Sequence, residues 1–103
     1  MEGDSKALEE LFKSSKPGQK HRVQHYLYLP RMSDANEAAR LLEGSHFRIV
    51  ESRMGADGKN WLLLAEHEVV PNLPLITETR ITLTKIASQF DGEYDGWEAE
   101  VVR

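Results

Sequence analysis

The apolar residues of this 103-residue chain change spacing several times in a fixed order, and that order restricts the fold more than any other feature. Segments 21–30 and 93–102 alternate apolar and polar residues, as β-strands do, and segment 46–68 predicts a β-hairpin around its Gly-Ala-Asp-Gly turn. Segments 33–44 and 69–92 space their apolar residues three and four apart, as helices do. From residue 21 the sequence therefore predicts the order β-α-β-β-α-β.

Segment 69–92 is ambiguous, because its stretch "ITETRITLT" also alternates like a strand. Each of its four threonines costs a helix about half a kcal/mol relative to alanine. Burial of a large apolar side chain contributes roughly 1.5–3 kcal/mol, which outweighs that deficit. Four apolar residues fall on one helical face, namely Ile76, Leu83, Ala87 and Phe90. The balance favours a helix.

Two helical crossovers around a hairpin indicate an α+β fold of the ferredoxin-like class, with four antiparallel strands and two helices on one face. We expect residues 21–103 to form this domain. Residues 1–16 predict an N-terminal amphipathic helix appended to it, and residues 17–20 predict a linker that contains Pro17 and Gly18.

Composition excludes several classes of protein and site. The chain has no cysteine, so it can form neither disulfides nor zinc–cysteine sites. No apolar run approaches the roughly 18 residues that span a bilayer, and the first residues lack the pattern of a secretory signal. We therefore expect a cytoplasmic protein that does not enter membranes.

No recognised catalytic or cofactor motif is present. The chain lacks a phosphate-binding glycine loop, a paired-histidine zinc helix and a nucleophile elbow. The "EHE" stretch at 66–68 predicts a polar strand end rather than a metal site, because neighbouring residues of a strand point to opposite faces. His21, His25 and His46 are scattered along the sequence. We expect no catalytic residue, no metal and no cofactor.

The stretch "EYDGWE" at 93–98 combines three acids with two aromatics and a glycine. Paired carboxylates can hydrolyse glycosides, but that chemistry needs a cleft that one edge strand does not provide. The stretch instead predicts the fourth strand, kinked or bulged at Asp95-Gly96 so that Trp97 points into the core. Its acids should lie on a solvated edge.

Charge is distributed unevenly along the chain, whose net charge is −4. Residues 91–103 carry five acids and one arginine, whereas residues 13–22 carry four cations and no acid. In the predicted fold the first and fourth strands are antiparallel neighbours. Lys20 and Arg22 should therefore lie near Glu98 and Glu100, on the side away from the helices, where such pairs contribute only about 0–1 kcal/mol each.

Three stretches together resemble the regulator of ribonuclease E activity B family: "HYLYLP", "WLLLAEHEVVP" and, above all, "FDGEYDGWEA". The resemblance covers about residues 21–101 and leaves the N-terminal helix outside. It implies a ferredoxin-like fold. It also implies an inhibitor that docks on the endoribonuclease of the RNA-degradation machinery and changes what that enzyme cuts.

The leading hypothesis is therefore a non-enzymatic regulatory domain that binds a protein, with an endoribonuclease as the candidate partner. The alternative is a single-stranded RNA-binding module on a sheet like that of the RNA-recognition motif. Against it, "NWLLLAEH" lacks the basic and aromatic pattern of that motif, and an acidic chain repels phosphates. Direct nucleic-acid binding is thus disfavoured.

The sheet face away from the helices is the predicted binding surface. Val23, Leu27 and Leu29 should point to the core, which turns the neighbouring tyrosines outward. A hairpin that pairs Met54 with Lys59 would add two residues of the third strand. The predicted partner-binding residues are Tyr26, Tyr28, Trp61 and Leu63.

That face has two other candidate occupants. A second copy of the chain could use it to form a homodimer. Alternatively, the N-terminal helix could fold back over it with Leu8, Leu11 and Phe12, so that nothing else binds there.

Overall fold

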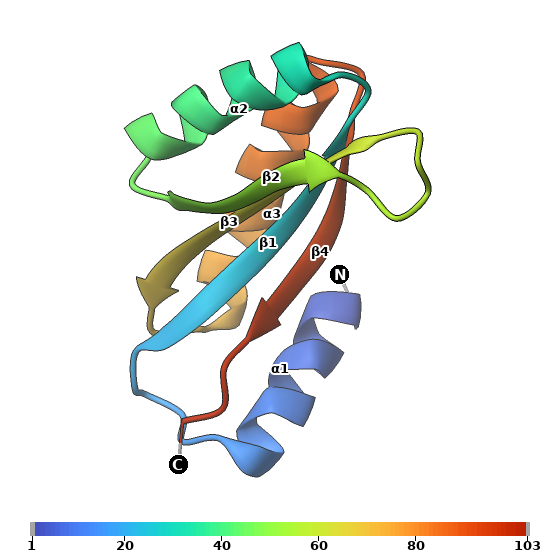
Figure 1. Ribbon diagram of the computed structural model, residues 1–103. Coiled ribbons are helices and arrows are strands. Elements are labelled where there is room, and N and C mark those ends of the chain that lie inside the picture. The colour runs from blue at the N-terminus through green and yellow to red at the C-terminus, as the bar shows by residue number, and fades with distance from the viewer. Residues whose placement is uncertain (1, 103) are drawn as a thin grey trace.

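The computed structural model describes residues 2–102 and shows an α+β protein with three helices and a four-stranded antiparallel sheet (Figure 1). The predicted order of elements from residue 21 is confirmed. In chain order the elements are α1 (Glu2–Ser14), β1 (His21–Leu29), α2 (Met32–Gly44), β2 (Arg48–Met54), β3 (Trp61–Val69), α3 (Leu73–Ser88) and β4 (Glu93–Ala99).

The strands are arranged in the order β2-β3-β1-β4, so β3 and β1 are central and β2 and β4 form the edges. The predicted antiparallel pairing of the first and fourth strands is confirmed. Along β1 the odd-numbered residues are buried, while the even-numbered residues are exposed or partly exposed. The alternation seen in the sequence therefore separates a helix-covered face from an open face.

The ambiguous segment is a helix, as predicted. Asn72 caps α3 by accepting a hydrogen bond from the backbone N–H of Leu75 at 2.9 Å. Ile76 and Leu83 are buried on its inner face. The principal core lies between α2, α3 and the sheet, and it buries Leu27, Leu29, Ala35, Ala38, Leu42, Leu63, Ala65, Leu83, Ile86 and Ala87.

The "EYDGWE" stretch forms β4, as predicted, and its irregularity lies at the expected position. Tyr26 pairs with Gly96 and Leu27 pairs with Tyr94, so Asp95 is an extra, bulged residue. Gly96 has a φ of 118°, which favours glycine. Beyond the bulge, Trp97 faces the helices and packs, half-buried, against the core.

The predicted register of the hairpin is wrong, and with it the placement of two predicted site residues. Met54 pairs with Trp61 instead of Lys59, and Val50 is bulged between Ile49 and Glu51. The bulge reverses the alternation of β2, so that Ile49 and Ser52 lie on the same face. Trp61 and Leu63 therefore face the helices, where Leu63 is buried in the core.

The N-terminal helix does not cover the open face, so the structure excludes this one of the alternative occupants. Leu8 is 6% exposed and packs with Val23 and Ile76, on the helix-covered side of the sheet. Figure 1 shows α1 alongside β4, with the end of the chain next to the end of the helix. There Ser15 Oγ accepts a hydrogen bond from the backbone N–H of Val102 at 2.6 Å.

A buried ion pair fixes the other end of α1. The Asp4 carboxylate is 1% exposed and accepts hydrogen bonds from Arg80 of α3 at 2.6 and 2.8 Å. The indole N–H of Trp97 donates to the same carboxylate at 3.1 Å. Hydrogen bonds from Arg80 lower the pKa of Asp4, although burial opposes its ionisation. Helix, sheet and α3 are thus joined at one point.

Candidate functional site

The open face of the sheet has an apolar centre on its two middle strands. Tyr26 and Tyr28 of β1 lie opposite Leu64 and Leu62 of β3. No helix among residues 2–102 covers this side, yet Leu62 is 5% and Leu64 8% exposed. The leucines are buried because the tyrosines border them on one side and an ion pair on β2, between Glu51 and Arg53, borders them on the other.

Two of the four predicted site residues, Tyr26 and Tyr28, lie on this face, and Leu62 and Leu64 take the positions predicted for Trp61 and Leu63. The run "WLLLA" has leucines at both parities, so it does not reveal its own orientation. A signal was nevertheless available. Glu66 and Glu68 share the parity of Leu62 and Leu64, and two acids so placed indicate the solvent side of a strand.

A neutralised charge cluster borders the apolar centre toward the end of β3. Glu66 is 6% exposed and accepts hydrogen bonds from two nitrogens of Arg48, and from Gln24 at 3.3 Å. Burial of Glu66 opposes its ionisation, but the hydrogen bonds from Arg48 and Gln24 outweigh it and lower its pKa. This part of the face carries paired charges.

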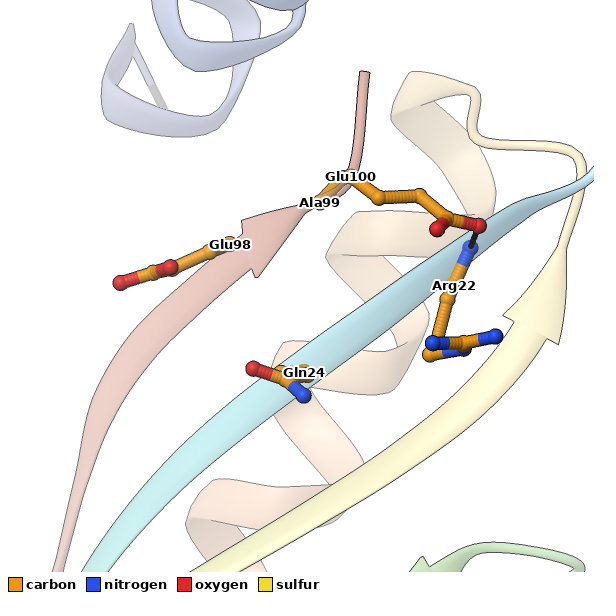
Figure 2. A pocket seen from close by; sticks show the side chains of 5 residues that line it. All are labelled: Arg22, Gln24, Glu98, Ala99 and Glu100. Carbon is orange, nitrogen blue, oxygen red and sulfur yellow. Dashed lines mark hydrogen bonds between the residues drawn. The ribbon is translucent and has the colours of Figure 1, made fainter. Parts of the chain in front are cut away.

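The β4 side of the open face is hollowed twice. Figure 2 shows the first hollow, of about 170 Å³, where the Glu100 carboxylate accepts a hydrogen bond from the backbone N–H of Arg22 at 3.0 Å. Arg22 and Glu100 are close together, as predicted, but the contact is made by the backbone of Arg22, and among residues 2–102 neither Lys20 nor Arg22 forms the predicted ion pair with Glu98 or Glu100. The second hollow, of about 310 Å³, is lined by Tyr26, Tyr28, Asp95, Gly96, Trp97 and Glu98. Glu98 lines both hollows, so they lie next to each other along β4.

A second polar cluster lies under the helices. His25 is fully buried, and its two ring nitrogens lie 2.8 Å from the Tyr94 hydroxyl and 2.9 Å from Nε2 of His67. Burial, and then the charges of His67 and Arg80, lower the pKa of His25 to about 3. The His25 imidazole is therefore neutral at pH 7, and the cluster ties β1 to β3 and β4 on the helix-covered side of the sheet.

Within residues 2–102, no group of three or more histidines, aspartates or glutamates is placed to hold a metal ion. In the same range no helix is long and apolar enough to cross a membrane. Of the predicted site residues, the open face carries Tyr26 and Tyr28, and this face is the candidate site.

Comparison with known proteins gives one family. The family model described as RraB, regulator of ribonuclease activity B, matches residues 2–99. The match includes α1, which the resemblance drawn from the sequence had left outside. No curated protein matches the chain significantly.

Proposed function

Since the chain belongs to the regulator of ribonuclease activity B family, we propose that it is a non-enzymatic regulator that binds a ribonuclease E-type endoribonuclease. The description of the family as a regulator of ribonuclease activity supports this role. Binding would change which RNAs the enzyme cuts or how fast it cuts them. A regulator of this kind would act in the cytoplasm, where such an enzyme meets its substrates.

The open face is the docking surface in this proposal, with Tyr26, Tyr28, Leu62 and Leu64 at its centre. The observation that carries it is a pair of partly exposed tyrosines, beside two leucines that are almost fully buried, on a side of the sheet that no helix among residues 2–102 covers. Protein interfaces commonly place aromatic residues in such a centre and charged residues around it. The ion pairs on β2 and β3 and the acids of β4 supply that rim.

We also assign the domain to the ferredoxin-like class. The β-α-β-β-α-β succession supports this assignment, together with a sheet whose two central strands are β1 and β3.

The test combines binding and cleavage. The endoribonuclease from the same organism is immobilised, and its binding of the protein is measured at increasing protein concentrations. Cleavage of a labelled RNA by the same enzyme is measured in parallel. The double variant Tyr26→Ala/Tyr28→Ala should bind at least about tenfold more weakly, as expected for aromatic residues at the centre of an interface. The control Leu41→Ala/Ile81→Ala removes two exposed apolar side chains from α2 and α3 and should bind normally.

Wild-type protein that neither binds the enzyme nor alters its cleavage would refute the proposed function. Normal binding by the tyrosine variant would refute the docking surface alone. Retention of single-stranded RNA on filters, lost when salt is raised from 50 to 200 mM as phosphate contacts require, would favour the RNA-binding alternative instead.

A further inference from the structure

The open face is electrostatically asymmetric. On the β2 and β3 side, Glu51 pairs with Arg53 and Glu66 pairs with Arg48. On the β4 side, four acids follow one another along the strand and its continuation. They are Glu93, Asp95, Glu98 and Glu100, and none of them has a cationic side chain within ion-pair distance among residues 2–102. Arg22 lines the smaller hollow together with Glu98 and Glu100, whereas the lining of the larger hollow contains two acids and no cation.

The larger hollow brings this charge together with two aromatic rings. Tyr26 and Tyr28 line it together with Asp95 and Glu98. Gly96 lies directly opposite Tyr26 and has no side chain, so the space beside that ring stays open. Both Asp95 and Glu98 are exposed, so a ligand in the hollow can reach their carboxylates from solvent.

This combination of groups matches one side chain better than others. A guanidinium is planar, stacks on aromatic rings and donates paired hydrogen bonds to carboxylates. A lysine ammonium can neutralise the acids, but it does not stack on aromatic rings and does not donate paired hydrogen bonds to a carboxylate. A nucleic-acid backbone would place phosphates against four acids, which is unfavourable.

We propose that this hollow receives an arginine side chain from a basic segment of the partner protein. The proposal rests on the proposed function in one respect, that the partner is a protein which docks on the open face. Tyr26 and Tyr28 then have two roles, since they lie opposite the leucines of β3 and also line the acidic hollow.

The probe is a fluorescein-labelled ten-residue peptide of alternating arginine and glycine, with a lysine–glycine peptide of equal charge as comparison. Fluorescence anisotropy of each is followed as the full-length chain is titrated at 50 and 200 mM salt. We expect the arginine peptide to bind at least threefold more tightly than the lysine peptide. We expect Asp95→Asn/Glu98→Gln to weaken arginine-peptide binding by about tenfold, from the loss of two charge-assisted contacts.

The matched control is Glu9→Gln/Glu37→Gln. It removes the same charge from exposed positions on α1 and α2 and should change binding less than twofold. An equal loss in both double variants, or equal binding of the two peptides, would overturn the arginine site in favour of general electrostatic attraction. No binding of the arginine peptide at 50 mM salt would also overturn it.

Two further measurements separate this inference from the proposed function. If Asp95→Asn/Glu98→Gln binds the endoribonuclease normally while Tyr26→Ala/Tyr28→Ala does not, the arginine site is refuted and the docking face stands. If the endoribonuclease does not bind but the arginine peptide does, with the expected loss in the acid variant, the function fails and the site stands. A wild-type dimer in sedimentation that the acid variant abolishes would make a second copy the occupant and overturn the proposal.

Discussion

Lowering the pH from 7.5 to 5 should destabilise the protein, mainly through the buried His25. His25 has a pKa of about 3 in the folded chain, whereas an unfolded histidine titrates near 6.5. Between these two values the unfolded chain binds the proton more readily than the folded chain. The free energy of unfolding therefore falls as the pH falls through this window, and it is fully retained above it.

The size of the effect follows from the width of the window. Each pH unit within it costs about 1.4 kcal/mol per proton, so His25 alone should cost about 2 kcal/mol between pH 7.5 and 5. Burial also lowers the pKa of His67, which acts in the same direction. The pKa values of Asp4, Asp57 and Glu66 are also lowered. The stability that these three carboxylates contribute is lost mainly below pH 5.

Urea unfolding followed by circular dichroism at each pH measures the change. With a slope of about 1 kcal/mol per molar urea for a domain of this size, the midpoint should fall by about 2 M. The variant His25→Gln should be less stable at pH 7.5, but its midpoint should depend less on pH. A wild-type midpoint that stays constant over this range, or an unchanged dependence in the variant, would refute the reasoning.

Three further predictions concern stability and are measured by the same urea titration. Asp4→Asn should cost about 1–3 kcal/mol and increase amide exchange in α1, because Arg80 loses its charged partner in a partly exposed setting. Unchanged amide exchange in α1 would show that the Asp4–Arg80 pair does not fix this helix. Trp97→Ala should cost about 3 kcal/mol, and a neutral result would make the tryptophan a surface residue. Gly92→Ala should cost about 1–3 kcal/mol, because a Cβ there would meet the Tyr28 carbonyl oxygen and Leu29 Cδ1, whereas Gly44→Ala meets nothing within 4 Å and should be tolerated.

The helices and strands themselves could be predicted from the spacing of apolar residues. The register in which neighbouring strands pair could not be predicted as well. In β1 alternation alone places Tyr26 and Tyr28 on the open face, because every second residue is a buried apolar group or histidine. In the hairpin one extra residue, Val50, reverses the alternation, and no turn signal marks a bulge inside a strand. This is why the orientation of Trp61 could not be predicted from Ile49.

The docking position of α1 could not be predicted either. Its apolar stripe indicates an amphipathic helix, but a stripe does not specify which surface it covers. The position of α1 is fixed by the pairing of Asp4 with Arg80, two residues 76 positions apart. An acid near the start of a helix predicts a favourable terminus at most. Only the assembled core shows that this acid is buried and paired.

The two bulges have a consequence for self-association. Both extra residues, Val50 and Asp95, lie in edge strands, and the central strands β1 and β3 pair without a register shift. An edge strand with a regular backbone ladder is a template on which another sheet can grow, whereas a bulged and charged edge interrupts that template. The bulges and charges of β2 and β4 therefore disfavour the addition of further chains at either edge of the sheet. The open face can then stay available for the proposed partner.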